Sequence, residues 1–272
     1  MEVISLDLGL DYDKLGFDKS SKVSFTGYIQ KPYNPEEKRP AVIVCPGGAY
    51  RICAPHEGDP VALQFVAEGI GAFILNYSVA PAVFPQAFIE LSQAISIVRK
   101  NAQEWGIDSN KICILGFSAG GHLVGSVGTL WNSKYAKQYG FHGENKPNGM
   151  LLCYPVISSD PSFGHMGSFD NLLGKNKSEE MLRELSLEKA VSQDTAPTFI
   201  YSTFEDAAVP VKNTLVFVSS LNEHKIPFEL HVYPKGQHGL SLASRITASK
   251  EEDCIPGLAT WIKHAIDWVC NL

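Results

Sequence analysis

The stretch CILGFSAGG, residues 113–121, decides how this chain folds. A short apolar run leads directly into GFSAG, residues 116–120, and a helix-like segment follows. Between a strand and a helix, the serine of a G-x-S-x-G pattern takes a strained backbone conformation in a sharp turn, and small neighbours let the two elements approach closely. The stretch therefore predicts a buried strand that ends in an exposed nucleophile, Ser118. A glycine-rich turn with an incidental serine is the alternative.

The rest of the chain alternates strand-like and helix-like segments. A short continuous apolar run, typical of a strand covered on both faces, occurs at residues 41–46, and further strand-like segments occur at 72–79, 111–118, 149–157, 197–206 and 228–234. Apolar residues at helical spacing occur at 59–69, 84–106, 119–132, 211–225 and 255–272. Residues 22–32 alternate apolar and polar side chains, as an antiparallel strand does. This alternation predicts the α/β class, with a mostly parallel central sheet and helices on both faces.

Residues 158–190 interrupt the alternation. This segment is polar and loop-rich, and one short helix is predicted within it, at residues 178–185. No linker, repeat or low-complexity tract divides the chain. We therefore expect a single domain over residues 1–272. In this domain, residues 158–190 would form a small insertion over the carboxyl ends of the strands, where ligands bind in such sheets.

The composition excludes several classes of function. The 272 residues are 44% hydrophobic and 19% charged, with a formal net charge of −6. No basic cluster suggests nucleic-acid binding, and no apolar stretch approaches the roughly 18 residues of a membrane span. The start of the chain does not have the pattern of a secretory signal. The six cysteines form no C-x-x-C pair, so we expect no zinc or redox site and reduced thiols in a cytoplasmic protein.

A serine hydroxyl needs a base and an orienting acid before it can act as a nucleophile. For this kind of turn, the expected order along the chain is serine, acid, histidine. Asp206 follows one predicted strand and His238 follows the next, which places both at the same edge of the sheet as Ser118. Glu205 is the competing acid, and a solvated carboxylate and a surface histidine are the alternatives. His122, on the helix after Ser118, is expected to pack or to form hydrogen bonds.

A second glycine-rich turn, PGGAY at residues 46–50, follows the predicted strand 41–46. Consecutive small residues leave backbone N–H groups free to face a ligand. The first amides of the helix after Ser118 also carry partial positive charge. We expect the two groups of amides to receive a developing oxyanion. A simple glycine turn is the alternative.

Six segments together resemble the α/β-hydrolase superfamily, and within it the small bacterial acetylesterases related to acetylxylan esterases. The segments are CPGGAY, LNYSVAP, GIDSNKICILGFSAGGHL, LLCYPVIS, TAPTFIYSTFEDAAVPVKN and ELHVYPKGQHGL. They keep the family's order and cover most of residues 40–245. The resemblance implies that Ser118 is the nucleophile, Asp206 the acid and His238 the base.

The resemblance further implies that the amides of Gly48, Ala49 and Ala119 form the oxyanion hole. Pro46 stands where relatives of hormone-sensitive lipase have a histidine, and Ala49 stands where they have a third glycine. A backbone donor survives both changes, so the hole is still expected. Glu205 stands where the family more often has an aspartate, which does not change the predicted acid.

The activity implied by the resemblance is removal of short acyl groups, above all acetyl, from a sugar or a xylo-oligosaccharide. The substrate would be a small-molecule ester, and we expect neither a metal nor an organic cofactor. Some side chains could line an acyl or sugar pocket, with core packing as the alternative role. These candidates are Tyr50, Phe163, His165, Met166 and Phe169.

Two other functions remain open. Prolyl-oligopeptidase-like peptidases and acylpeptide hydrolases share the late D…VP and HG segments, but they carry a large propeller domain for which this sequence has no room upstream. A non-catalytic binding protein of hydrolase fold is the second alternative. Such proteins have usually lost one of the three reactive residues, and all three candidates are present here.

Overall fold

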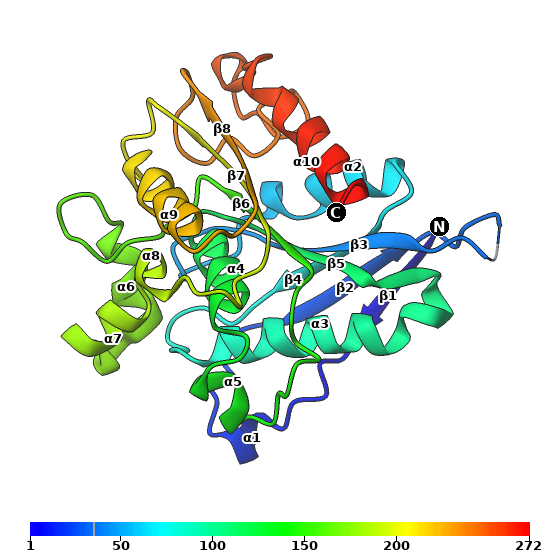
Figure 1. Cartoon of the computed structure of the whole chain (residues 1–272), viewed down its shortest axis with the longest axis horizontal. Helices are drawn as coiled ribbons and strands as arrows, with labels where there is room; N and C mark the ends of the chain where they lie inside the picture. Colours follow the sequence, from blue (N-terminus) through cyan, green and yellow to red (C-terminus); the bar gives the residue numbers. More distant parts are fainter. Residues whose placement is uncertain (35) are drawn as a thin grey trace.

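The computed structural model describes residues 1–34 and 36–272, which are built around an eight-stranded sheet (Figure 1). The strands are β1 (Glu2–Leu6), β2 (Ser24–Ile29), β3 (Arg39–Cys45), β4 (Gly71–Asn76), β5 (Ile107–Phe117), β6 (Gly149–Cys153), β7 (Thr198–Thr203) and β8 (Phe228–Tyr233). Their order across the sheet is β1-β2-β4-β3-β5-β6-β7-β8. The pairs β1–β2 and β2–β4 are antiparallel, and every later pair is parallel. The predicted mostly parallel sheet is confirmed.

Helices cover both faces of this sheet, also as predicted. They are α1 (Tyr12–Leu15), α2 (Asp59–Ala67), α3 (Gln86–Trp105), α4 (Ser118–Leu130), α5 (Lys134–Gln138), α6 (Met166–Leu173), α7 (Glu179–Glu184), α8 (Leu187–Ala190), α9 (Lys212–Glu223) and α10 (Trp261–Cys270). Single 3-10 turns are η1 (Pro55–Glu57), η2 (Gly174–Asn176), η3 (Glu251–Asp253) and η4 (Leu258–Thr260). The side chains of α3, α4 and α9 belong to one buried cluster, whereas those of α2 and α10 belong to another across the sheet (Figure 1).

The two-sided burial explains why the central strands are continuous apolar runs. On β3, Ile43 and Cys45 face the cluster under α3 and α4, while Val42 and Val44 face the cluster under α2 and α10. All four side chains are fully buried. Because successive residues of a strand point to opposite faces, a strand with both faces covered needs apolar residues at every position.

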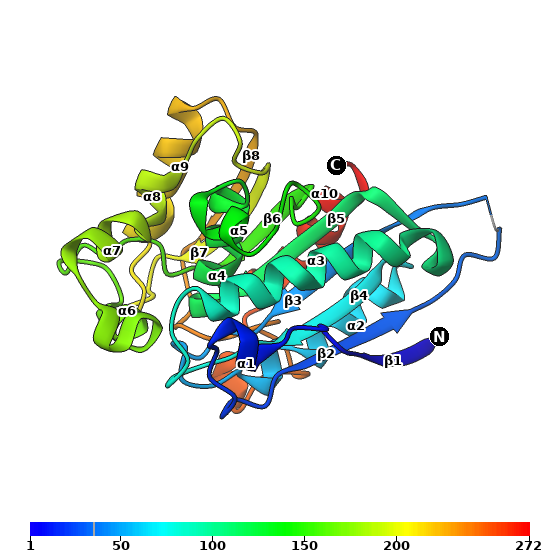
Figure 2. The same cartoon turned by 90° about the horizontal axis from the view of Figure 1, so that it is seen from below.

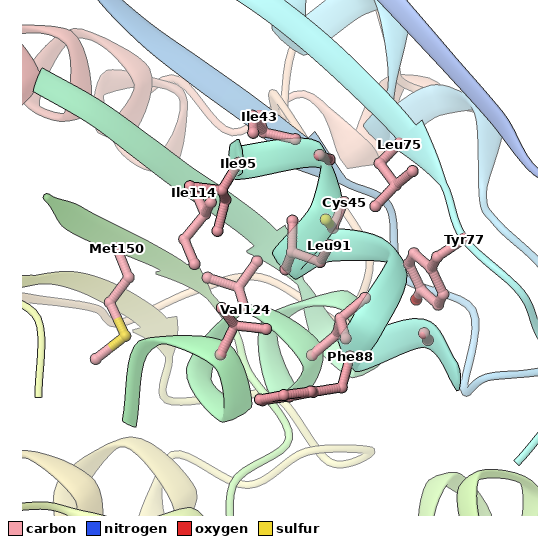
Figure 3. Close-up of a cluster of buried hydrophobic side chains, with 14 of the residues drawn as sticks. Ile43, Cys45, Leu75, Tyr77, Phe88, Leu91, Ile95, Ile114, Val124 and Met150 are labelled. Atoms are coloured by element: carbon pink, nitrogen blue, oxygen red, sulfur yellow. The ribbon is translucent and has the colours of Figure 1, made fainter. Parts of the chain in front are cut away.

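The long helix α3 shows how helical spacing builds the larger cluster. Figure 3 shows Leu91 and Ile95, four residues apart on α3, beside Ile43 of β3 and Ile114 of β5, with Val124 of α4 next to them. Ile43 and Ile114 are direct partners across the parallel pair β3–β5. Residues four apart lie on the same face of a helix, so one apolar stripe covers two neighbouring strands.

Residues 158–190 contain more helix than the sequence predicts. The predicted helix at 178–185 is present as α7, but α6 and α8 were not predicted. Gly167 and Asn171 weaken the helical signal of α6. Burial of Phe169 and Leu173 in the core stabilises this helix, because tertiary packing outweighs weak intrinsic propensity. The three helices gather at one end of the molecule, close to α9 (Figure 2). That they act as a cap within a single domain stays a prediction.

The structure also bears on the expected lack of a membrane-spanning segment and on the expected reduced thiols. None of the helices within residues 1–34 and 36–272 has both the length and the apolar character that crossing a bilayer requires. All six cysteines lie in the described part of the chain and are free thiols, as expected.

Candidate active site

Ser118 lies at the junction between β5 and α4. Its backbone φ is +52°, the left-handed region that residues other than glycine rarely occupy. A Cβ added to Gly116 would lie 2.1 Å from the carbonyl oxygen of Gly120, and one added to Gly120 would lie 2.3 Å from the carbonyl oxygen of Cys45. Both positions therefore require glycine, for the steric reason inferred from the sequence.

Ser118, His238 and Asp206 lie in one hydrogen-bonded row. The Nε2 atom of His238 is 2.8 Å from Oγ of Ser118, and its Nδ1 atom is 2.7 Å from Oδ2 of Asp206. The other oxygen of Asp206, Oδ1, accepts hydrogen bonds from the amides of Ala208 (3.0 Å) and Val209 (2.8 Å). These bonds orient the carboxylate, whose side chain is fully buried. The structure thus brings together the three residues that the sequence singled out.

Glu205 does not join this row. Its side chain is exposed, and its Oε2 atom accepts a hydrogen bond from the amide of Gly236 at 3.2 Å. Asp206 and Glu205 are neighbours in the sequence, but only Asp206 is directed toward His238. The course of the backbone after β7 therefore determines which of the two acids bonds to His238.

The turn at residues 46–50 leaves two amides free beside the nucleophile. The amide of Gly47 donates to Oε2 of Glu57 at 2.7 Å, whereas those of Gly48 and Ala49 have no acceptor among the residues described. Ala49 has a φ of +55°, and its carbonyl oxygen accepts a hydrogen bond from Nδ2 of Asn171 at 2.7 Å. Asn171 belongs to α6, so the insertion holds this turn in place.

Ala119 supplies a third amide near the same point. It is the second residue of α4, where the N–H has no partner within the helix. Helix N-termini also carry partial positive charge. The amides of Gly48, Ala49 and Ala119 are therefore available to a ligand at Ser118.

A cavity of about 250 Å³ opens beside these groups. Ser118, His238, Gly48 and Ala49 line it together with His165 from the insertion. Its remaining wall includes Arg51, Ile52 and His56, from the segment that follows the turn. The cavity combines a nucleophile, a base and free backbone donors with a mixed polar and apolar wall, the composition typical of a ligand site.

Of the five pocket candidates, only His165 lines this cavity. Its Nδ1 atom lies 2.9 Å from Oγ and 3.3 Å from the amide of Ser168, in the first turn of helix α6, so His165 caps this helix. Burial lowers the pKa of His165, so the neutral ring is favoured. With Nδ1 as an acceptor, the hydrogen of the neutral ring is carried by Nε2, which is left as a donor.

The other four candidates pack elsewhere, which corrects the expectation from the sequence. The hydroxyl of Tyr50 bonds to Nδ1 of buried His122 at 2.9 Å, and Phe169 packs edge-on against the same ring, 5.1 Å between ring centroids. Both side chains are buried, because each packs against the buried ring of His122. Phe163 lies beneath the ammonium group of Lys212, and Met166 packs against the core.

Two further buried residues belong to the site region. His122 is buried, and its Nε2 atom lies 2.8 Å from the carbonyl oxygen of Leu185, so it joins α4 to the insertion, in line with the packing role expected for it. Burial lowers the pKa of His122 to about 4. Glu57 is a buried acid adjoining the cavity, and no motif in the sequence distinguishes it.

Comparison with known families shows which family the chain belongs to. The model of the family described as BD-FAE matches residues 28–221, a stretch that includes Ser118 and Asp206. The chain belongs to the BD-FAE family. His238 lies beyond the matched residues, and the structure places it beside Ser118.

Relatives of this BD-FAE member are named as a xylanase and as esterases. It is 39% identical over 222 residues to Endo-1,4-beta-xylanase B of Butyrivibrio fibrisolvens, and the match covers 78% of this chain and 34% of that protein. It is 32% identical over 237 residues to Acetylxylan esterase of Xylanibacter ruminicola, and the match covers 85% of this chain and 46% of that protein. The chain thus spans less than half the length of either relative.

Solved structures confirm the α/β-hydrolase fold of this BD-FAE chain. The acetyl ester-xyloside bifunctional hydrolase from Caldicellulosiruptor lactoaceticus superposes with a TM-score of 0.83 at 36% sequence identity, covering 97% of this chain and 94% of that one. The carboxylesterase Cest-2923 from Lactobacillus plantarum superposes with a TM-score of 0.82 at 23% identity, covering 99% and 97%, and shows the same fold. By family and fold, the chain is grouped with esterases of the serine-hydrolase type.

Proposed function

We propose that this chain is a serine esterase that removes short acyl groups, above all acetyl, from acetylated sugars or xylo-oligosaccharides. The observation that carries the proposal is the row from Ser118 Oγ through His238 to Asp206, beside the free amides of Gly48 and Ala49. The row supplies an activated nucleophile, and the amides supply donors for the charge that develops during attack.

In the first half of the reaction, Oγ of Ser118 attacks the ester carbonyl carbon while its proton moves to Nε2 of His238. Asp206 orients the ring and stabilises the imidazolium. The carbonyl electrons move onto oxygen, which the amides of Gly48, Ala49 and Ala119 receive. Loss of one such donor typically costs about 3–4 kcal/mol of transition-state stabilisation. The intermediate then releases the sugar alcohol, whose oxygen takes the proton from Nε2, and leaves an acyl group on Ser118.

Water completes the cycle by the same route. A water molecule gives its proton to Nε2 of His238 as its oxygen attacks the acyl carbon. The tetrahedral intermediate collapses, Ser118 leaves with the proton from Nε2, and the carboxylic acid departs. The protein supplies every proton acceptor and donor in this sequence, so the proposed reaction needs no metal or organic cofactor.

The size and walls of the cavity support the choice of substrate. A volume of about 250 Å³ accommodates an acetyl group and part of a sugar ring, but not a long acyl chain as well. His165 lines the cavity, and its Nε2–H is a donor suited to a sugar hydroxyl. The names of the xylanase, acetylxylan-esterase and acetyl ester-xyloside relatives agree with an acetylated xylose unit.

We further propose that small oligosaccharides, rather than polymeric xylan, are the substrates. The six free cysteines are consistent with the reducing cytoplasm that we expect for this protein. A polymer would not reach an enzyme in that compartment, whereas imported oligosaccharides would.

A panel of acyl compounds tests this proposal. Acetate release would be measured from acetylated xylo-oligosaccharides, from other acetylated sugars and from N-acetylated peptides. We expect the acetylated xylo-oligosaccharides to have the highest kcat/KM and the peptides to be inert. Faster cleavage of the peptides would favour the acylpeptide-hydrolase alternative. A folded wild-type protein that neither releases acetate nor reacts with a fluorophosphonate would favour the non-catalytic alternative.

A further inference from the structure

Glu57 is a buried acid beside the nucleophile that the proposed mechanism does not use. It ends the turn η1, is 2% exposed and adjoins the cavity that contains Ser118. Burial raises the pKa of this carboxyl. Within residues 1–34 and 36–272, the nearest cationic partner is His56, whose Nε2 atom is 4.0 Å from Oε1. A buried carboxylate is costly unless hydrogen bonds compensate its lost hydration.

One carboxylate oxygen of Glu57 holds the start of the oxyanion turn. Oε2 accepts a hydrogen bond from the amide of Gly47 at 2.7 Å, and Gly47 directly precedes Gly48 and Ala49. The contact is tight, because a Cβ on Gly47 would lie 2.8 Å from Oε2 of Glu57 and 3.0 Å from Cβ of Ser118. Glu57, Gly47 and the nucleophile therefore form one close-packed group.

The other oxygen of Glu57 holds the segment that carries the base. Oε1 accepts a hydrogen bond from the hydroxyl of Tyr154 at 2.6 Å, and the same hydroxyl accepts one from the amide of Ser241 at 3.0 Å. Ser241 lies three residues after His238 and has a φ of +50°, so its backbone needs outside support. The ring of Tyr154 also packs edge-on against His238, 5.1 Å between centroids.

The hydrogen bonds around Glu57 favour its ionised form. The amide of Gly47 can only donate, and among the described residues Glu57 is the recorded acceptor for the hydrogen of the Tyr154 hydroxyl, whose oxygen accepts from Ser241. A protonated Glu57 would have to donate to the hydroxyl of Tyr154, and the hydrogen of that hydroxyl would then lose its acceptor. The carboxylate is therefore the form that satisfies both loops at once.

We propose that Glu57 is a positioning residue that fastens the oxyanion turn to the His238 loop, on the two sides of Ser118. The inference rests on the proposed serine mechanism and adds a residue to it. Through Gly47 the carboxylate sets the direction of the free amides, and through Tyr154 and Ser241 it sets the place of His238. A displacement of about 1 Å at either point costs roughly 100-fold in rate.

The charge of Glu57 has a second consequence at His238. The titratable groups near Glu57 are His56, Cys53, Tyr77, Cys153, Tyr154, Tyr201 and His238. Burial raises the pKa of each of these tyrosines and cysteines, so they are neutral near pH 7. The carboxylate of Glu57 attracts a positive charge on either His56 or His238. Removing its charge makes the imidazolium of His238 less favourable.

The test is the variant Glu57→Gln, assayed with an activated acetyl ester. A glutamine that keeps the bond from Gly47 turns its amide N–H toward Tyr154, so the hydrogen of that hydroxyl loses its acceptor and the link to the His238 loop is weakened. We expect kcat to fall by roughly 10- to 100-fold, KM to change by less than about threefold, and the acid limb of the kcat/KM–pH profile to move to lower pH. A kcat within about twofold of wild type, or an acid limb that does not move, would overturn the proposal.

Glu90→Gln is the matched control. Glu90 is also fully buried, and it also bonds a tyrosine hydroxyl (Tyr12, 3.1 Å) and a backbone amide (Ser78, 2.7 Å), but it does not line the cavity. We expect this variant to lower the melting temperature and leave kcat and the pH profile unchanged. An equal loss of kcat in the control would assign the effect of Glu57→Gln to general destabilisation.

Tyr154→Phe keeps the proposal testable if Glu57→Gln does not fold. This variant keeps the packing against His238 and the bond from Gly47 to Glu57, but breaks the link to Ser241. We expect kcat to fall by roughly 5- to 20-fold at little change in KM, and an unchanged kcat would contradict the proposal. Fluorophosphonate labelling of Ser118 in the wild-type protein separates failure of this inference from failure of the proposed function. If Ser118 is labelled but Glu57→Gln has wild-type kinetics, the positioning role of Glu57 is wrong and the proposed function stands.

Discussion

The Nε2 atom of His238 lies 2.8 Å from Oγ of Ser118, although the two residues are 120 positions apart in the chain. The contact forms because the loops after β5 and β8 open at the same edge of a parallel sheet. At this distance the ring can take the hydroxyl proton directly. The proposed chemistry therefore depends on one contact between distant loops, which can be tested from either side.

The variant Ser118→Ala removes the proposed nucleophile. We expect it to lower kcat for p-nitrophenyl acetate by roughly a thousandfold or more, because loss of a triad residue costs several orders of magnitude. Alanine is smaller than serine, so the circular dichroism spectrum should match that of wild type. A folded variant that keeps a tenth or more of the wild-type kcat would show that another group is the nucleophile.

The two neighbouring acids should differ sharply on substitution. Asp206→Asn removes the charge that faces Nδ1 of His238, whereas Glu205→Gln changes an exposed side chain that holds the amide of Gly236. We expect the asparagine variant to lose roughly a thousandfold or more in kcat, because it favours the wrong histidine tautomer. The glutamine variant should stay within about threefold of wild type. Greater damage from Glu205→Gln would move the acid to that residue.

A methyl group on Gly120 should be strongly destabilising. Its Cβ would lie 2.3 Å from the carbonyl oxygen of Cys45, so Gly120→Ala forces the strand and the helix apart. We expect the free energy of unfolding to fall by about 3 kcal/mol or more, with loss of esterase activity. Gly257→Ala is the control, because nothing lies within 4 Å of its added Cβ, and its φ of −64° suits alanine. Equal denaturation midpoints for the two variants would contradict this account of the turn.

His122 should make stability depend on pH. Its pKa falls from 6.5 to about 4 on burial, so below pH 6.5 the unfolded chain binds a proton that the folded chain does not. Its contribution to stability is therefore complete above pH 6.5 and is lost as the pH falls toward 4. The loss amounts to roughly 3 kcal/mol.

The measurement compares urea unfolding of wild type with His122→Gln from pH 7.5 to 4. We expect the advantage of wild type to shrink as the pH falls, which isolates His122 from the buried acids. The raised pKa values of Glu57 and Glu90 act with the opposite sign, since the folded chain binds their protons more readily. Parallel curves for the two proteins would exclude His122 as a source of the pH dependence.

The size of the cavity should appear as a preference for short acyl chains. We expect acetyl and propionyl esters of p-nitrophenol to have a kcat/KM at least tenfold above that of the octanoyl ester, because about 250 Å³ does not hold an eight-carbon chain together with the leaving group. Equal active-site concentrations, set by fluorophosphonate titration, control the comparison. A higher kcat/KM for the octanoyl ester would indicate a deeper acyl tunnel than the structure contains.

The fold could be predicted well because its signals are local. The apolar runs of β3 to β7 follow from burial on both faces, whereas β8 lies at the edge of the sheet with Phe228 and Val232 exposed. The insertion was predicted less well, since α6 is stabilised by the burial of Phe169 and Leu173 and not by its own propensity. The sequence also does not separate pocket positions from core positions at Phe169 and Tyr50, because the inward and outward faces of a short helix or turn look alike in sequence.

The sequence by itself determined the glycines around Ser118 and the order of nucleophile, acid and base, because each follows from steric and chemical demands within a few residues. Only the tertiary structure decided which of the five pocket candidates, His165, lines the cavity, and that Glu57 joins the two loops. These contacts connect segments far apart in the chain, and the direction of each side chain depends on the packing of the elements between them. No local pattern carries that information.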